Sequence, residues 1–317
     1  MTTLTARTVR LGTRPSPMAM EQTTRFAHAF RAQYPDITLD ILEITSEGDA
    51  HHGPLSQIGG KGAFTRRADE HLLAGQVDAT IACAKDLPSP HDRAPGTTVA
   101  AVLPREDARD VLVLPTGHPR ATLAELPPGT RVGTSAPRRA ALLHALYPKL
   151  TAVPIRGNAD RRLARLDGGE LGVDVMIAAL AGLRRLGFAD RADEILDPTL
   201  WLPAAGAGIV VVEHRADDAA TAELLAPLTH PATRILLDAE RAVLAGLEGG
   251  CLTAASAHAT LEDGRVTVHA TVLDPAGGPA LRTDSSGPAD RAADVGRKAA
   301  QGLLNAGAAR LLAITPE

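Results

Sequence analysis

Strand-like and helix-like segments alternate along the first half of the chain, and this alternation limits the possible folds more than any other feature of the sequence. Ser16 is a natural N-cap, and Pro17 suits the first turn of the helix that follows it. In order, we predict a strand at residues 8–12, a helix at 17–34, a strand at 37–41, a helix at 63–75 and a strand at 78–83. Such alternation predicts a parallel α/β sheet that binds ligands at the carboxyl ends of its strands.

A second α/β run follows. We predict strands at residues 110–114, 131–132, 150–155 and 174–178, and helices at 138–146, 158–166 and 179–186. The Pro- and Gly-rich patches at 127–129 and 203–208 indicate turns or hinges. The apolar strand at 209–213 is expected to return to the sheet of the first domain, because the chain must cross back before its C-terminal part.

The pattern changes from about residue 228 onward. A long helix at 232–247 precedes alternating strands at 254–260, 265–273 and 280–283, and a last helix covers 289–306. A helix, three antiparallel strands and a second helix make a small α+β domain. The predicted domains are therefore residues 1–103 plus 204–227, residues 104–203, and residues 228–317.

The composition is that of a soluble globular protein. The chain has 317 residues, of which 44% are hydrophobic and 22% charged, and its net charge of -4 gives no reason to expect nucleic-acid binding. Neither an N-terminal apolar segment nor a long apolar run occurs, so we predict no secretion and no membrane span. Two cysteines make no disulfide framework, which favours a cytoplasmic location. The eleven histidines are scattered without a metal-binding spacing, so no metal is expected.

Six arginines lie at the ends of predicted strands and helices rather than on polar helix faces. They are Arg14, Arg138, Arg139, Arg156, Arg162 and Arg185. Arginine binds carboxylate through two parallel hydrogen bonds, so this set suits a ligand that carries many carboxylates. The alternative for each one is an ordinary ion pair with Asp or Glu.

Three loops carry further candidates for chemistry. Cys251 follows two glycines at the end of the long helix, and it could be a nucleophile, an attachment point or a buried structural thiol. Lys61 lies in a Gly-Gly-Lys-Gly stretch that is no Walker A motif, and we interpret this stretch as a mobile lid or an ordinary loop. Lys85 and Asp86 follow a predicted strand, where a carboxylate suits acid–base work or simply forms a turn.

Taken together and in order, these segments resemble the hydroxymethylbilane synthase family, also called porphobilinogen deaminase. The matching segments are residues 13–17 (TRPSP), 59–64 (GGKGAF), 85–88 (KDLP), 105–110 (REDARD), 133–135 (GTS) with Arg138 and Arg139, 156–158 (RGN) with Arg162, 181–187 (AGLRRLG), 240–242 (ERA) and 247–251 (LEGGC). Each segment alone is weak evidence, whereas the ordered set over nearly the whole chain is specific.

The resemblance implies three domains, of which the first two are similar to the lobes of type II periplasmic binding proteins and the third is small and α+β. It implies a transferase that joins four porphobilinogen units head to tail, releasing ammonia each time, to give hydroxymethylbilane. The product grows on a dipyrromethane cofactor held through a thioether, and Cys251 matches the anchoring residue. The protein is expected to be a cytoplasmic monomer whose partner is its small-molecule substrate.

The resemblance also assigns roles to individual residues. Asp86 matches the catalytic carboxylate, with Lys85 beside it. The cofactor-binding positions are Lys61, Ser16, Thr134, Ser135, Arg138, Arg139, Arg156 and Gly157, and the substrate-binding positions are Arg14, Arg156, Arg162, Arg185, Phe64 and Gln22. The chemistry agrees, because loss of ammonia leaves a cation that a carboxylate stabilises, and each pyrrole brings two carboxylates for the arginines to bind.

Several positions depart from the family pattern. A His-Ser pair before the catalytic motif is Ala82-Cys83 here, a Ser is Ala136, a Gln is Ala207, a Lys is Gln57 and a Pro is Ala254. Three hypotheses follow: the housekeeping enzyme, a diverged paralogue that makes a different or shorter oligopyrrole, and a non-catalytic pyrrole-binding homologue. The retained Asp86 and Cys251 favour an enzyme, since binding alone needs neither.

Cys83 lies three residues before Asp86, so its side chain could face either the cleft or the core. If strand alternation continues, Cys83 and Lys85 share a face, which places the thiol at the wall of the cleft. A thiol there would donate a weaker hydrogen bond than a hydroxyl and would be more reactive beside a lysine. The alternative is an inert thiol that faces the core.

Overall fold

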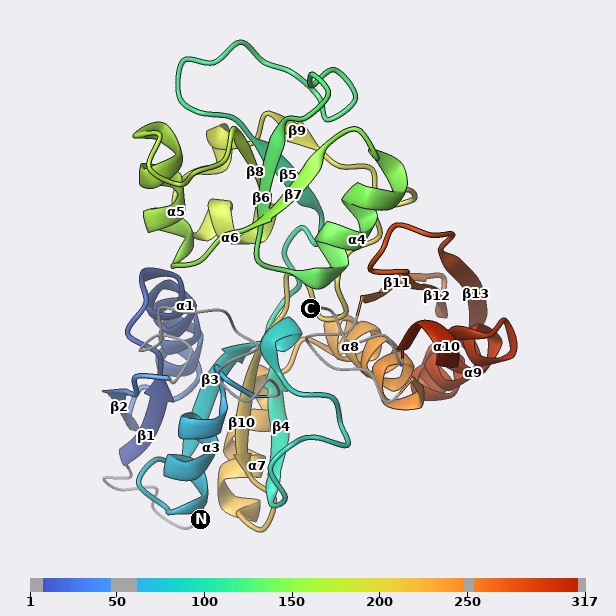
Figure 1. Ribbon diagram of the computed structural model, residues 1–317. Helices are drawn as coiled ribbons and strands as arrows, with labels where there is room; N and C mark the ends of the chain where they lie inside the picture. Colours follow the sequence, from blue (N-terminus) through green and yellow to red (C-terminus); the bar gives the residue numbers. More distant parts are fainter. Residues whose placement is uncertain (1–7, 47–61, 248–253, 313–317) are drawn as a thin grey trace. The chain divides into compact units, whose positions relative to one another are not determined.

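The computed structural model describes residues 8–46, 62–247 and 254–312 (Figure 1). The chain divides into two compact units. Unit 1 is Met1–Pro88, Asp92–Arg105 and Ile209–Arg234, and unit 2 is Ser89–His91, Glu106–Gly208 and Ile235–Glu317. Among the described residues, no helix is both long enough and apolar enough to span a bilayer.

Unit 1 is built on a five-stranded sheet with the order β2-β1-β3-β10-β4. The strands are β1 (Thr8–Thr13), β2 (Thr38–Glu43), β3 (Ala79–Cys83), β4 (Thr97–Val102) and β10 (Val210–Arg215), and the helices are α1 (Pro17–Gln33), α3 (Arg66–Leu73) and α7 (Ala219–Leu225). The predicted N-cap of α1 is confirmed, because the Ser16 side chain accepts a hydrogen bond from the Ala19 amide. Phe26 and Phe30 of α1 are fully buried in the core of this unit.

The sheet of unit 1 is mixed. The predicted parallel arrangement is confirmed for β1, β2 and β3, whereas no direction was predicted for the strand at 209–213. β1 pairs in parallel with β2 and β3, whereas β10 lies antiparallel between β3 and β4. The predicted return of residues 209–213 to the first sheet is confirmed. β10 is reached only after residues 106–208 of unit 2, and it runs antiparallel to both of its neighbours.

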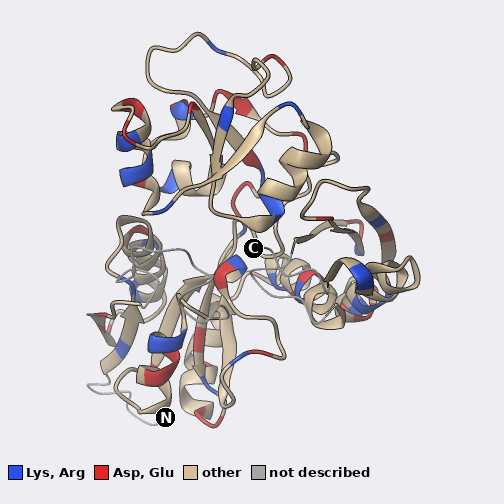
Figure 2. Ribbon diagram, viewed as in Figure 1, with Lys and Arg blue, Asp and Glu red and all other residues tan. Residues whose placement is uncertain are grey.

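The first part of unit 2 repeats this strand order. Its sheet runs β7-β6-β8-β5-β9, with β6 parallel to β7 and β8 and with β5 antiparallel to β8. The strands are β5 (Asp110–Val113), β6 (Arg131–Thr134), β7 (Thr151–Pro154), β8 (Val175–Ala179) and β9 (Glu194–Ile195), and the helices are α4 (Pro137–Leu146), α5 (Ala159–Asp167) and α6 (Leu180–Arg185). Figure 2 shows that several of the basic residues of this lobe lie on α5.

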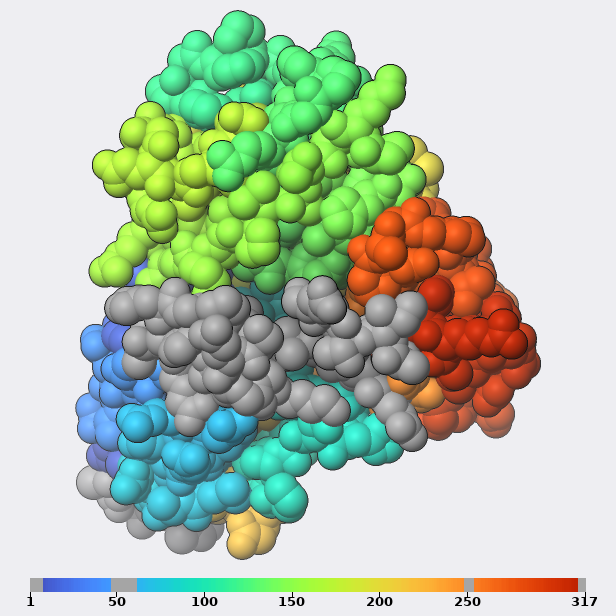
Figure 3. All heavy atoms as spheres, in the orientation of Figure 1, coloured from blue at the N-terminus to red at the C-terminus, as the bar shows by residue number. Residues whose placement is uncertain are grey.

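The last part of unit 2 is the predicted α+β domain, with an antiparallel sheet of order β11-β12-β13. Its strands are β11 (Ala255–Glu262), β12 (Arg265–Val272) and β13 (Leu281–Pro288), and its helices are α8 (Pro231–Gly246), α9 (Ala292–Asn305) and α10 (Ala308–Leu312). β13 is twice as long as the predicted 280–283, because pairing with β12 continues to Pro288 despite the weak strand formers Ser285 to Gly287. In the space-filling view, this domain forms the orange and red surface (Figure 3).

One face of this sheet packs against α8 and α9. Alanines and valines of β11 and β12 form a buried cluster with Val243 of α8 and Val295 of α9. The two helices touch closely, since a Cβ at Gly296 would lie 2.1 Å from the carbonyl oxygen of Ala239. Glycine is therefore required at this crossing.

A buried cluster of charged side chains in the first part of unit 2 centres on Asp110, at the start of β5. Its carboxylate accepts hydrogen bonds from Arg138 Nη2 at 2.5 Å, from Arg139 Nη2 at 2.7 Å and from Trp201 Nε1 at 3.0 Å. Burial alone would raise the pKa of Asp110, but the charges of Arg138 and Arg139 outweigh it and hold the pKa well below its usual value. The cluster joins β5 to α4 and to the segment that contains Trp201.

We expect Asp110→Asn to destabilise the protein strongly, because it leaves two buried guanidinium groups without their counter-ion. The cost should be about 3–5 kcal/mol, visible as a lower urea midpoint at pH 7. Since the pKa of Asp110 is depressed, its contribution is present at neutral pH and is lost as the pH falls below about 4. Asp294→Asn, which breaks an exposed pair with Arg297, is the control and should cost less than about 1 kcal/mol. Equal midpoints for the two variants would contradict the prediction.

Candidate functional site

The predicted catalytic residues lie in a tight turn at the carboxyl end of β3. β3 ends at Cys83, and Ala84–Asp86 forms a single 3₁₀ turn in which Lys85 and Asp86 are both half-buried. The turn is fixed at its start, because the Ala84 amide donates to the Ile209 carbonyl at 3.0 Å. Asp86 is therefore held by backbone geometry at the strand end where open α/β sheets bind ligands.

Cys83 contacts a second predicted residue. Gln22 of α1 is 3% exposed, and its Nε2 donates to Cys83 Sγ at 2.9 Å. The thiol itself is half-buried, so it does not face the core fully. The expectation that Cys83 and Lys85 share a strand face is wrong, because the strand ends at Cys83 and Lys85 belongs to the following turn.

The remaining predicted residues of unit 1 lie near the start of α1 and α3. The Arg14 guanidinium lies over the Phe64 ring, 4.5 Å from its centroid, and both side chains are half-buried. Ser16 is buried, and its hydroxyl caps α1. A cation–π contact of this kind restrains the guanidinium, a group that can bind a carboxylate through two parallel N–H bonds.

In unit 2, another set of predicted residues gathers where β6 and β7 end. Thr134 closes β6 and is 4% exposed, with its hydroxyl accepting from the Ala136 amide. Ser135 follows, and its hydroxyl accepts from Arg162 Nη1 at 3.4 Å. The two strands are paired through Thr134 and Pro154, so the residues that follow each strand leave the sheet at the same edge.

Arg156 and Gly157 form the entry to α5. Arg156 is half-buried, burial lowers its pKa, and its Nε has no hydrogen-bond partner among the described residues. Gly157 has a φ of +105°, a backbone conformation that disfavours other residues. A half-buried guanidinium whose buried Nε–H lacks a partner, near a helix N-terminus, is suited to bind an anion.

Three other predicted arginines have partners inside unit 2. Arg138 and Arg139 bind Asp110, and they also donate to the carbonyls of Leu202 and Ile177. Arg185 is 8% exposed and donates to the Gly208 carbonyl at 2.9 Å, with Glu106 3.4 Å from its Nε. These three arginines therefore form ion pairs with acidic residues of the protein, as the alternative interpretation of the sequence allowed. Their roles in ligand binding stay predictions.

Two predicted residues, Cys251 and Lys61, lie outside the described residues, as does Gln57. The elements that flank Cys251 are described, because α8 ends at Gly246 and β11 begins at Ala255. Among the described residues, no group of three or more His, Cys, Asp or Glu could hold a metal ion.

Glu240 of α8 links the flanks of the Cys251 segment, and it was recognised in the sequence only as part of a motif. It is fully buried; its Oε2 accepts from the Gly206 amide and its Oε1 from the Ala259 amide, each at 2.7 Å. Ala259 lies on β11, an edge strand, so the carboxylate satisfies an amide that the sheet leaves open. The carboxylate thus connects α8 with β11 and with the hinge-like segment 203–208.

Asp69 of α3 is a buried acid that the sequence did not single out. It is 8% exposed within the charged run of α3, and nothing in that run marks it as buried. Burial, and then the nearby Glu213, raise the pKa of Asp69 to about 7, against the opposing charge of Arg93. Glu213 itself pairs with Arg93 at 2.5 Å. Asp69 also lines a hollow of about 270 Å³ at the start of α3.

Comparisons with known proteins find relatives that match nearly the whole chain. Residues 9–223 match the family model described as porphobilinogen deaminase, dipyromethane cofactor binding domain, and residues 235–305 match the model described as its C-terminal domain. The chain is 43% identical to the porphobilinogen deaminase of Chromobacterium violaceum over 304 residues, which cover 96% of each protein. It is 39% identical to porphobilinogen deaminase 2 of Streptomyces coelicolor over 305 residues, again 96% of each.

Among solved structures, the methionine-binding protein MetQ is similar with a TM-score of 0.45 and 11% identity, covering 70% of this chain and 89% of that one. A likeness this weak says nothing about function.

The raised pKa of Asp69 makes stability depend on pH. The folded state keeps the proton up to about pH 7, whereas the unfolded chain releases it near 3.8, so stability should fall as the pH rises between these values. We expect Asp69→Asn to be more stable than the wild type at pH 8 by on the order of 1 kcal/mol or more, with the gain shrinking toward pH 4. Urea midpoints at several pH values measure this. Glu70→Gln, on the exposed side of the same helix, is the control, and the same pH profile for both variants would exclude Asp69 as the cause.

The contact between Gln22 and Cys83 can be tested by changing only the acceptor. In Cys83→Ser a hydroxyl still accepts from Gln22 Nε2, so stability should stay within about 1 kcal/mol of the wild type. In Cys83→Val the buried amide loses this acceptor, and the free energy of unfolding should fall by about 1–3 kcal/mol. Denaturant titration of both variants decides the matter. A valine variant as stable as the serine variant would show that the thiol only fills space.

Proposed function

The chain belongs to the porphobilinogen deaminase family, and we propose that it joins four porphobilinogen units head to tail to give hydroxymethylbilane, on a dipyrromethane anchored at Cys251. The observation that carries this proposal is the position of Asp86, in a fixed turn at the carboxyl end of a central strand. We further propose that the protein works as a monomer in the cytoplasm.

The residues of unit 2 fit a ligand with acetate and propionate side chains. The unsatisfied Arg156 Nε and the amides at the start of α5 need an acceptor, which a carboxylate supplies. The hydroxyls of Thr134 and Ser135 lie where β6 ends and can donate to the same class of group. Lys61, Arg138 and Arg139 complete the proposed set. When bound, the dipyrromethane supplies a chain end that stays attached between additions.

Asp86 has two tasks in this proposal. Departure of ammonia leaves a positive charge on the substrate, and a carboxylate at hydrogen-bond distance stabilises that charge as it develops. The same carboxylate can hold the proton of the pyrrole nitrogen and return it. Lys85, next in the turn, can pair with a substrate carboxylate without competing for the cation. The backbone of this turn is held by the bond from the Ala84 amide to the Ile209 carbonyl, directly before β10.

The substrate side of unit 1 would be formed by Arg14, Phe64 and Gln22, whereas Ser16 belongs to the proposed cofactor set. Arg14 lies over the Phe64 ring, and a guanidinium can bind a substrate carboxylate through two N–H groups. The proposed substrate residues of unit 2 are Arg162, which also contacts Ser135, and Arg185, which donates to Gly208. These are positions matched residue by residue, and their roles rest on that match.

A second candidate function is a paralogue that makes a different or shorter oligopyrrole. It is favoured by Ala207, which is 6% exposed where the family pattern has a glutamine amide, and by Ala136 at a position where the pattern has a hydroxyl. Two polar groups are thus replaced by methyl groups. Mass spectrometry of the products formed from porphobilinogen distinguishes four-ring from shorter chains.

Replacing Asp86 by Asn should leave the fold intact but remove charge stabilisation and proton transfer together. We expect turnover of porphobilinogen to fall by about 10²-fold or more, at an unchanged urea midpoint. Asp40→Asn, an exposed carboxylate on β2 of the same sheet, is the matched control and should turn over normally. Near-normal turnover of the Asp86 variant would remove this residue from the mechanism.

If Cys251 anchors the cofactor, the intact mass of the purified protein should exceed that of the chain by two pyrrole units, and peptide mapping should locate the addition at residue 251. Cys251→Ser should lack the added mass and the activity, whereas Cys83→Ser should keep both. An active wild-type protein without added mass would overturn the proposed attachment.

A further inference from the structure

The outer face of the C-terminal sheet carries polar residues in two rows that run across its strands. His258, His269 and Asp284 are directly opposite one another on β11, β12 and β13. Ser256, Thr271 and Arg282 form the neighbouring row. The residues between them turn the other way, onto α8 and α9. One solvated polar face is common for such sheets, so the rows alone do not indicate a binding site.

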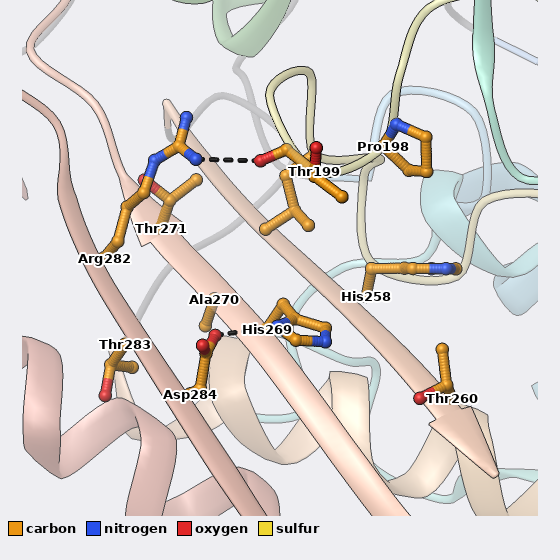
Figure 4. A pocket seen from close by; sticks show the side chains of 11 residues that line it. Pro198, Thr199, His258, Thr260, His269, Ala270, Thr271, Arg282, Thr283 and Asp284 are labelled. Carbon is orange, nitrogen blue, oxygen red and sulfur yellow. Dashed lines mark hydrogen bonds and ion pairs between the residues drawn. The ribbon is translucent and has the colours of Figure 1, made fainter. Parts of the chain in front are cut away.

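A hollow distinguishes this face from an ordinary solvated one. The loop with Pro198, Thr199 and Leu202 lies against it, within the same compact unit, and encloses a cavity of about 550 Å³. In Figure 4, His258 and His269 line one side of this space, and Pro198 and Thr199 lie across from them. A hollow of this volume is of the size that takes a small ligand.

Arg282 binds the loop that lines the hollow and keeps further N–H donors. Its Nη1 donates to the Thr199 carbonyl at 2.8 Å and its Nη2 to the Leu200 carbonyl at 3.0 Å. A guanidinium has five N–H groups, so three remain after these two bonds. The two carbonyls hold the group in place at the rim but do not neutralise its charge.

Each of the two imidazoles has a carboxylate near its Nδ1 atom. His269 Nδ1 lies 2.7 Å from Asp284 Oδ1, and His258 Nδ1, which is buried and makes no hydrogen bond among the described residues, lies 3.6 Å from Glu240 Oε1. His269 Nδ1–H can donate to Asp284, whereas 3.6 Å is too long for a hydrogen bond between His258 Nδ1 and Glu240. Only a ring that carries a proton on both nitrogens keeps an Nε2–H for an anion, so the site needs both imidazoles in that form. The hydroxyl of Thr260 also lines the space.

We propose that this hollow binds a small oxyanion, a carboxylate or a phosphate. The ligand would accept from Arg282 at the rim and from the Nε2–H groups of His258 and His269 on the sheet. Asp284 also lines the hollow, with its Oδ1 engaged by His269 Nδ1, and the carboxylate of Glu240 lies near His258 Nδ1. The site consists of residues of unit 2 alone, and none of its three donors belongs to the residues proposed for catalysis.

The test uses the full-length, cofactor-carrying protein with ¹³C-labelled histidine, titrated with inorganic phosphate and, separately, with citrate. We expect saturable shifts of the His258 and His269 ring signals, which are assigned by the loss of one signal in His258→Gln and in His269→Gln. Arg282→Met should raise the dissociation constant of the more tightly bound anion by about tenfold or more. Tighter binding of phosphate or of citrate shows whether the natural ligand carries a phosphate or a carboxylate group.

Two controls separate this site from the rest of the molecule. Arg297→Met removes an exposed arginine of α9 and should leave the titration unchanged. Arg156→Met should also leave the shifts of His258 and His269 unchanged, because it removes only the proposed site at α5. His269→Gln keeps the contacts of Arg282 with the loop, so a loss of binding there cannot come from a displaced wall. The proposal is overturned if neither anion moves the ring signals up to about 20 mM, or if Arg282→Met and wild type titrate alike.

Discussion

The carboxylate of Asp110 receives three buried donors, and much of unit 2 depends on that one group. Arg138 and Arg139 come from the first turn of α4 and Trp201 from the segment that leaves the lobe, so the carboxylate joins elements that are far apart in the sequence. The connection extends further, because Arg138 also donates to the Leu202 carbonyl, and Ser256 of β11 donates to the same oxygen. Each guanidinium is tolerable in the interior only while the acid is ionised, and the acid is ionised only because both guanidiniums are there.

This arrangement also shows what a sequence can and cannot reveal. Most of the elements followed from apolar spacing and begin or end within three residues of the predicted positions, since burial of one face dictates that spacing. The elements β4, β9, α7 and α10 were not predicted. The turn with Asp86 and the entry to α5 followed from residue types at strand ends. Strand direction did not, because β10 and β5 look like any apolar strand, and only the connection decides whether such a strand runs parallel.

The partners of buried charged residues could not be predicted from the sequence either. The arginine pair at the start of α4 was interpreted as ligand binding from its position alone, whereas the acid opposite it lies 28 residues earlier in the chain. Asp69 and Glu240 gave no signal of burial, because a carboxylate inside a charged helix looks the same whether it faces water or the core. Pairing of this kind depends on tertiary contacts, and periodicity carries no information about it.

The place of β10 in the first sheet has a consequence for how the protein is made. β10 separates β3 from β4 and ties down the turn that contains Asp86, yet it comes more than a hundred residues after both strands. A ribosome delivers the segments of the second lobe before it delivers β10, and domains tend to fold as units while synthesis proceeds. Until residue 215 emerges, β3 has an open edge and β4 lacks its partner. The nascent chain therefore carries an incomplete sheet while the inserted lobe assembles, and the turn with Asp86 is among the last parts to take shape.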